Sequence, residues 1–275
     1  MVTQEQRRRQ LAREKFLRQQ QRRTSARRKA RMRNAAIASV LGVILIGSVA
    51  LYTTGVVLGD DDDSKTNASA EVTPSASAPS KAPDPCEKPA EGKVKTQTWK
   101  KEPAMTVDKS AKYTMKLATT CGDIGIALKT DAAPHTVNSF NFLAGKGFFD
   151  HTPCHRLTTN GIFVLQCGDP TGQGNGGPGY NIPDENLKDK SLKSNTYPAG
   201  TVAMANTGQP DSGGSQFFLV YQDSPLPPSY TPFGTISDEG MAVLKKIAKA
   251  GESTGQGDGA PNATVVIDKA TVTKS

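Results

Sequence analysis

The fold is decided by residues 155–169, which read HRLTTNGIFVLQCGD. Two short apolar stretches, His155–Leu157 and Phe163–Gln166, flank a polar turn, which is the pattern of two β-strands joined as a hairpin. Stretches of the same kind recur along the chain, at Tyr113–Thr119, Ile124–Leu128, Thr201–Asn206, Gln216–Val220, Phe233–Ile236 and Val265–Asp268. Many short strands of this kind indicate a mainly β fold.

Two segments have the spacing of amphipathic helices instead. In Thr136–Lys146, apolar side chains recur every three or four residues, with Pro134 near the start and glycines at the end. Asp238–Ala250 places its apolar residues on one face, and Gly251 closes it. We therefore predict that residues 112–275 form a closed antiparallel β-barrel capped by two α-helices, since about 160 residues are ample for one core.

The order of several sequence blocks narrows this prediction. The blocks are His155–Leu157, Gly161–Gln166, Gly168–Asp169, Met204–Asn206, Gly214–Phe218 and Tyr230–Gly234. Together they resemble the cyclophilin family of peptidyl-prolyl cis-trans isomerases, over roughly Lys112 to Val272. The resemblance implies an eight-stranded antiparallel barrel with two capping helices, and an enzyme that uses neither a cofactor nor a metal.

The implied reaction explains which residue types are needed. Rotating an X-Pro bond means passing a twisted amide about 18–20 kcal/mol uphill, because resonance must be broken. In that state the proline nitrogen gains a lone pair, which an always-charged arginine donor suits. Preorganised electrostatics, rather than a nucleophile, then supplies most of the rate. By resemblance, Arg156 is the catalytic arginine, and Gln166 orients Arg156 or the substrate backbone.

Substrate-binding roles fall by resemblance on eight further residues: Phe163, Val164, Ala205, Asn206, Gln216, Phe218, Leu226 and Tyr230. The phenylalanines, the valine and the leucine form an apolar slot for the proline ring. The Ala–Asn pair presents backbone groups to an extended peptide, and the glutamine adds a hydrogen bond. The tyrosine stands where the family usually has a histidine.

Two departures from the family pattern stand out. Thr158–Asn160 lengthens the hairpin turn, so Arg156 and Gln166 are two residues further apart than usual. Pro225–Pro228 occupies the region where the family commonly has a tryptophan. Cyclosporin binding commonly uses that tryptophan, so we expect weak inhibition by cyclosporin.

The charge of the chain is concentrated at its N-terminus. Residues 1–33 contain thirteen Lys or Arg and two Glu, a net +11, which leaves −3 for the rest of a chain whose total is +8. We interpret these residues as a basic cytoplasmic tail. A folded domain without a basic face disfavours nucleic-acid binding.

Residues 34–59 form a run of 26 residues without a charge, with its apolar core at Ala35–Leu58. About 20 apolar residues suffice to cross a bilayer as a helix. A cleavable secretory signal is the alternative, but its apolar region is about 7–15 residues long. We predict a single transmembrane signal anchor. Arginines and Lys29 precede it and Asp60–Asp63 follow it, so the N-terminus is cytoplasmic and the domain is outside the cell membrane.

Residues 60–111 are predicted to be a linker rich in Ser, Ala and Pro. As far as about residue 84, it has too few large apolar side chains to offset its ordering entropy, which predicts a disordered stalk. Cys86 and Trp99 suggest that the rest docks partly on the domain.

All four cysteines follow the predicted span, so disulfides are plausible in an exported domain. Cys154 and Cys167 flank the predicted hairpin and are the first expected pair, and Cys86 with Cys121 is the second. Four free buried thiols are the alternative. Neither a CxxC motif nor metal-ligand spacing is present, so no metal site is predicted.

Residues 172–177, GQGNGG, match a dinucleotide-binding glycine pattern. That site needs a strand before the glycines and a helix after them. Pro178 and Gly179 follow instead, so we expect a loop near the substrate groove and no nucleotide.

Three functions compete. The first is a membrane-tethered isomerase that accelerates folding of exported proteins at X-Pro bonds, which isomerise in about 10–100 s without catalysis. The second is a holdase module that captures proline loops or unfolded chains with little turnover. The third is an envelope scaffold that acts through its tail and stalk. Arg156 favours the enzyme, and a monomer is expected.

Overall fold

Antiparallel strands dominate the part of the chain that the structure, a computed structural model, describes, which is residues 83–275. Ten strands form one sheet in the order β11-β4-β5-β8-β7-β10-β2-β1-β12-β3. Their bounds are β1 Tyr113–Thr119, β2 Gly122–Leu128, β3 Thr152–Pro153, β4 Arg156–Thr158, β5 Val164–Cys167, β7 Thr201–Met204, β8 Phe217–Val220, β10 Pro232–Ile236, β11 Asp258–Gly259 and β12 Val266–Lys274. A small second sheet pairs β6 (Thr196–Tyr197) with β9 (Ser224–Pro225), after a short 3-10 turn at Lys193–Asn195.

The predicted closed eight-stranded barrel is wrong in its closure and its strand number. The sheet is a curled one whose edge strands, β11 and β3, do not pair with each other within residues 83–275. The reason lies in the segment from β3 to β4. Cys154 N donates to Val265 O next to β12 (2.9 Å), whereas His155 N donates to Gln166 O of β5 (3.1 Å). The chain thus exchanges one partner strand for another between two adjacent residues, and the ladder is interrupted there.

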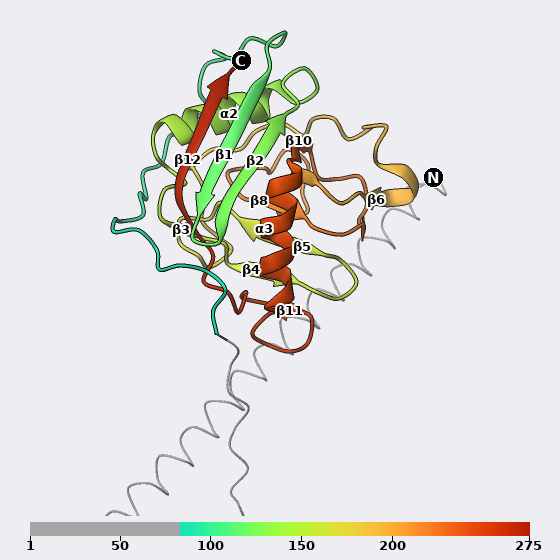
Figure 1. Cartoon of the computed structure of the whole chain (residues 1–275). Coiled ribbons are helices and arrows are strands. Elements are labelled where there is room, and N and C mark those ends of the chain that lie inside the picture. The colour runs from blue at the N-terminus through green and yellow to red at the C-terminus, as the bar shows by residue number, and fades with distance from the viewer. Residues whose placement is uncertain (1–82) are drawn as a thin grey trace, which may run out of the picture. The chain divides into compact units, whose positions relative to one another are not determined.

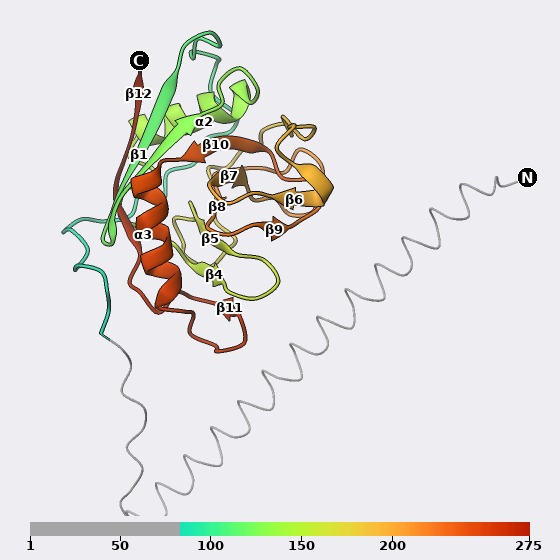
Figure 2. The same ribbon diagram turned by 45° about the vertical axis from the view of Figure 1, so that its right-hand side comes forward.

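Two helices cover this sheet, as the sequence predicts (Figures 1 and 2). Helix α2 (Pro134–Gly145) packs against β12, and helix α3 (Asp238–Lys249) packs against β2. Proline begins α2, where a missing N–H costs nothing. The hydroxyl of Ser237 caps α3 by accepting from Gly240 N at 3.1 Å. Figure 1 draws α3 in front of the strands and α2 behind β1 and β12.

The strands nearest the functional residues separate two hydrophobic clusters. Along β8, Phe217 and Leu219 belong to the main core, whereas Phe218 and Val220 belong to a smaller cluster with Val164. Successive side chains of a strand point to opposite faces of the sheet. The uninterrupted apolar run of β8 is therefore explained by apolar contacts on both of its faces.

Residues 83–111 have neither helix nor strand, yet their later part is docked on the domain. The Trp99 ring meets Phe142 edge-on at 5.1 Å between centroids, and Trp99 N donates to Pro178 O. The amide oxygen of Asn138 accepts from Thr106 N at 2.9 Å. The folded part therefore begins well before the predicted boundary at residue 112. The predicted tail, the predicted span and the stalk before residue 83 lie outside the described residues.

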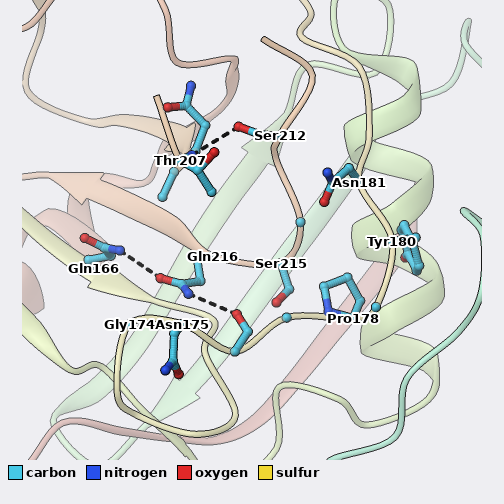
Figure 3. Close-up of a pocket in the computed structure, with 16 residues that line it drawn as sticks. Gln166, Gly174, Asn175, Pro178, Tyr180, Asn181, Thr207, Ser212, Ser215 and Gln216 are labelled. Atoms are coloured by element: carbon cyan, nitrogen blue, oxygen red, sulfur yellow. Dashed lines mark hydrogen bonds between the residues drawn. The ribbon is translucent and has the colours of Figure 1, made fainter. Parts of the chain in front are cut away.

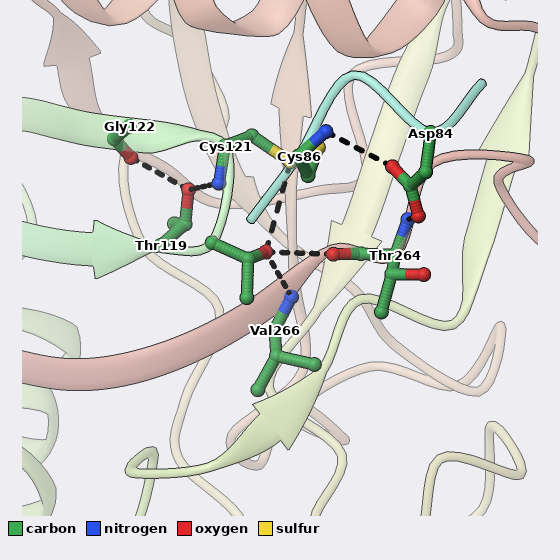
Figure 4. Close-up of a disulfide and its surroundings, with 8 residues drawn as sticks. Asp84, Cys86, Thr119, Cys121, Gly122, Thr264 and Val266 are labelled. Atoms are coloured by element: carbon green, nitrogen blue, oxygen red, sulfur yellow. Dashed lines mark hydrogen bonds between the residues drawn. A yellow bond between two sulfur atoms is a disulfide. The ribbon is translucent and has the colours of Figure 1, made fainter. Parts of the chain in front are cut away.

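Both expected disulfides are present, Cys154–Cys167 and Cys86–Cys121, so the alternative of four free thiols is wrong. The second bond ties the docked segment to the β1–β2 turn (Figure 4). Beside it, the hydroxyl of Thr120 donates to Thr264 O at 2.6 Å and accepts from Val266 N. Within residues 83–275, no helix combines the length and the apolar character that crossing a bilayer requires.

Candidate functional site

A small apolar pocket of about 120 Å³, here called the slot, opens between β4, β5 and β8. Its lining residues are Arg156, Ile162, Val164, Gln166, Ala205, Asn206, Phe218, Leu226 and Tyr230. The smaller hydrophobic cluster lies directly beneath it. One cation and two amide side chains thus stand on the rim of an apolar cavity.

Arg156 is held on three of its five donors. It lies on β4 opposite Gln166 of β5, and its Nη1 donates to Gln166 Oε1 at 3.2 Å. Its Nε and Nη2 donate to the two carboxylate oxygens of Asp258, at 2.7 and 2.8 Å. The hydrogen bond to Asp258 raises the pKa of Arg156, so the guanidinium stays charged at any relevant pH. One N–H on each terminal nitrogen has no partner among residues 83–275.

Three aromatic rings form one wall of the slot and its support. Phe218 meets Tyr230 edge-on at 5.4 Å between centroids, and buried Tyr197 lies 6.1 Å from Phe218. The Tyr197 hydroxyl donates to Tyr230 O at 2.7 Å and accepts from Tyr230 N at 3.1 Å. Burial raises the pKa of Tyr197 to about 12, so this phenol remains a donor. The tyrosine pair fixes the loop that carries Leu226 and Tyr230.

A chain of side-chain amides leads from Arg156 away from the slot. Gln166 Nε2 donates to Gln216 Oε1 at 2.9 Å, and Gln216 Nε2 donates to Gly176 O at 2.9 Å. Arginine can only donate and a backbone carbonyl can only accept. Both amides are therefore oriented in a single direction, and Gln216 is fixed between the slot and the loop that carries Gly176.

A second pocket of about 440 Å³ adjoins the slot (Figure 3). The two share Gln166, Ala205 and Asn206. Its remaining lining comes from two loops and is largely polar or glycine: Gly174, Asn175, Gly176, Gly177, Pro178, Gly179, Tyr180, Asn181, Thr207, Ser212, Gly214, Ser215 and Gln216. A chain that crosses the slot in an extended conformation would therefore continue into the second pocket.

The family is settled by comparison with known proteins. A model of the family "Cyclophilin type peptidyl-prolyl cis-trans isomerase/CLD" matches residues 114–272, which include every residue of the slot. The chain belongs to the cyclophilin family. Within residues 83–275, no group of three or more His, Cys, Asp or Glu side chains is placed to hold a metal ion.

Relatives and a solved structure agree with this membership. A probable peptidyl-prolyl cis-trans isomerase B of Mycobacterium leprae is 47% identical over 196 residues, which is 68% of this chain and 62% of the relative. Peptidyl-prolyl cis-trans isomerase B of Bacillus subtilis is 42% identical over 126 residues, 46% of this chain and 82% of the relative. The chain spans about three-fifths of the length of the mycobacterial relatives.

The fold also matches a solved cyclophilin. A crystal structure of a Cryptosporidium parvum cyclophilin-type isomerase superposes with a TM-score of 0.50 at 26% identity. The match covers 60% of this chain and 99% of the solved chain. The cyclophilin part thus accounts for the curled sheet and its two helices.

The structure brings most of the predicted site residues of this cyclophilin together. Eight line the slot: Arg156, Gln166, Val164, Ala205, Asn206, Phe218, Leu226 and Tyr230. Gln216 lines the second pocket instead, one hydrogen bond away. The two-residue lengthening of the hairpin does not disturb the pairing of Arg156 with Gln166.

Phe163 is the exception, because it is not among the residues that line the slot. Its ring lies edge-on to Tyr221 at 5.9 Å between centroids, and Ile162 stands in the slot instead. Alternation along a strand could have indicated this, since Ile162, Val164 and Gln166 are two residues apart and share a face. The other residue that the sequence analysis missed is Asp258, which lies 102 residues from Arg156 in the chain.

Proposed function

We propose that this chain is a peptidyl-prolyl cis-trans isomerase that acts without a covalent intermediate. The observation that carries the proposal is Arg156, a fixed cation with two unengaged N–H groups on the rim of an apolar slot. In the twisted amide the proline nitrogen becomes an acceptor, and a donor already in place lowers that state more than the planar one.

The remaining slot residues fit the other requirements of the reaction. Phe218, Leu226 and Val164 offer apolar contacts to a proline ring. Ala205 and Asn206 border both pockets, so backbone groups there are placed to pair with an extended peptide that crosses from one to the other. Gripping the peptide on each side of the proline would let one side turn while the other is held. No bond is made or broken, and no proton has to move.

The test is cis/trans exchange of an Ala-Pro peptide, measured by NMR with the full chain in detergent. The native protein should accelerate exchange, and Arg156→Ala should lose about 100- to 1,000-fold, as expected for removal of one preorganised donor. Arg156→Lys keeps the charge but not the fork, and should recover only a small part. Equal acceleration by native chain and Arg156→Ala would contradict the proposed role of Arg156.

A capture module with little turnover is the second candidate, and the size of the second pocket favours it. That pocket, at about 440 Å³, contains no group of Arg156. A holdase predicts that Arg156→Ala still suppresses aggregation of an unfolded client as well as the native chain. An isomerase predicts that refolding limited by proline isomerisation is accelerated by the native chain alone.

We further propose that the domain is tethered outside the cell membrane by residues 34–59. The supporting features are the uncharged run of 26 residues, the basic residues before it and the two disulfides of the domain. Disulfides persist in oxidising compartments. Protease added to intact cells should remove the domain and leave a membrane-bound fragment of the tail and span. Full protection of the domain in intact cells would contradict this location.

A further inference from the structure

Asp258 holds the proposed catalytic arginine more completely than any other residue of the described chain. Its two oxygens accept from Nε and Nη2 of Arg156, which is the bidentate fork geometry. The Arg156 side chain is 37% exposed and that of Asp258 is 56% exposed. An ion pair this exposed adds little stability. It does define the plane of the guanidinium.

The loop that carries Asp258 is built around a carboxylate. Within residues 252–261, ESTGQGDGAP, the Glu252 carboxylate accepts from Thr254 N, the Thr254 hydroxyl and Gly257 N, at 2.6, 2.7 and 2.8 Å. Gly255 and Gly257 have φ values of 66° and 89°, which other residues rarely adopt. Asp258 follows directly and pairs with Thr158 as part of β11.

The lengthened hairpin is the surface on which this loop docks. Thr159, in the hairpin turn, donates its N–H to Gly257 O at 2.9 Å. Gly259 pairs with Leu157, the residue that follows Arg156. The extra residues of the turn thus contact the loop that supplies Asp258, which gives the departure from the usual family spacing a structural purpose.

The same loop occurs a second time in the molecule. Residues 169–178, DPTGQGNGGP, share the central TGQG and the following pattern with residues 252–261. The Asp169 carboxylate accepts from Thr171 N, the Thr171 hydroxyl and Gly174 N, at 2.7, 2.8 and 2.6 Å. Gly172 and Gly174 have φ values of 64° and 82°. The position of Asp258 in the second loop is that of Asn175 in the first.

The two loops terminate one hydrogen-bonded chain. It begins at Asp258, passes through Arg156, Gln166 and Gln216, and ends at Gly176 O of the first loop. Every donor along it faces the same way because of its two ends. A change at Asp258 should therefore alter the orientation of the guanidinium rather than the wall of the slot.

We propose that Asp258 is a positioning residue for Arg156, an inference that rests on the proposed isomerase function. By engaging Nε and Nη2, Asp258 fixes the guanidinium so that its two unengaged N–H groups face the slot before substrate arrives. An arginine free to rotate must be ordered during each turnover, and misplacement of a reacting group by about 1 Å can cost on the order of 100-fold in rate.

The test compares Asp258→Asn with a matched control in the full-length protein. Asp258→Asn keeps size but replaces one acceptor with a donor that faces the guanidinium. The control is Asp123→Asn, which removes an equally short and equally exposed ion pair, with Lys116 at 2.7 Å and 58% exposure of Asp123, far from the slot in the β-sheet order. We expect kcat to fall about 10- to 100-fold in Asp258→Asn with KM little changed, and neither to change in the control.

A second readout does not depend on activity. Hydrogen exchange of Arg156 Nε–H, followed by NMR, should accelerate in Asp258→Asn and remain slow in Asp123→Asn. Asp258→Glu, which retains the carboxylate, should recover part of both kcat and protection. Unchanged kcat in Asp258→Asn, with an active native chain, would overturn the proposal. If the native chain is inactive, the proposed function fails, and unchanged Nε–H exchange would separately show that Asp258 does not hold Arg156.

Discussion

The two TGQG loops have one backbone design and different surroundings. The first, residues 169–178, is anchored by Asp169, which is fully buried and follows the disulfide residue Cys167 by two positions. The second, residues 252–261, is anchored by Glu252 and has no cysteine in it. At the matching position the first loop has Asn175, which lines the second pocket, and the second has Asp258, which binds Arg156.

This contrast separates construction from chemistry. In both loops a carboxylate satisfies backbone N–H groups that a tight turn would otherwise leave unpaired, and glycines take up the positive φ values. The exposed side chain one residue after the second such glycine is then free to differ. A neutral amide there borders a peptide-sized pocket, and a carboxylate there orients a cation.

Removal of the Cys154–Cys167 disulfide should produce the largest effect and distinguish the loops. The bond closes a segment with a sequence separation of 13, so replacing both cysteines with serine should cost about 3 kcal/mol in unfolding free energy. Urea unfolding measures that cost. Amide exchange at Gly174 should accelerate, whereas exchange at Gly257 should not.

The matched control for that variant is the double serine replacement of Cys86 and Cys121. This bond has a sequence separation of 35 and should cost about 4 kcal/mol, since it closes a longer loop. Neither TGQG loop should lose amide protection beyond that due to the lower global stability. Equal loss of protection at Gly174 and Gly257 in the first variant would show that the two loops are not independent.

Replacement of the anchoring carboxylates should give a smaller effect, larger in the first loop than in the second. Asp169→Asn leaves backbone N–H groups without an acceptor in a fully buried position, which should cost about 1–3 kcal/mol. Glu252→Gln should shift the urea midpoint less. It should, however, reduce isomerase activity more than its effect on stability suggests, because Asp258 moves with the loop. The reverse order of midpoint shifts would contradict the comparison.

The smallest effect is the acid limb of the pH–activity profile. The hydrogen bond from Arg156 lowers the pKa of Asp258, so the carboxylate is charged throughout the neutral range. Because this pKa is depressed in the folded protein, the fork is intact above the ordinary aspartate value of about 3.9 and is lost as pH falls below it. Activity should be flat from about pH 5 to 8. Asp258→Asn should be lower throughout and lose its acid limb, whereas an acid limb unchanged in that variant would assign it elsewhere.

Much of the site was predictable because its residues follow local rules or family blocks. The strands, both helices and both disulfide pairs were expected, and all but one of the predicted slot residues lie at or beside the slot. Phe163 was misplaced because a block of sequence was read without its alternation. The strand order could not be read locally, since the partner exchange at Cys154 and His155 depends on β12 and β5 together.

By itself, the sequence determined the mainly β fold, the family, the arginine at the centre of the proposed reaction and the four cysteines that pair. Only the tertiary structure decided how the sheet ends, where Phe163 points and what holds Arg156. The physical reason is distance along the chain. Asp258 and Arg156 are 102 residues apart, and their fork exists only because β11 pairs with β4. Side-chain periodicity reports on near neighbours, whereas such a contact depends on the closure of the whole fold.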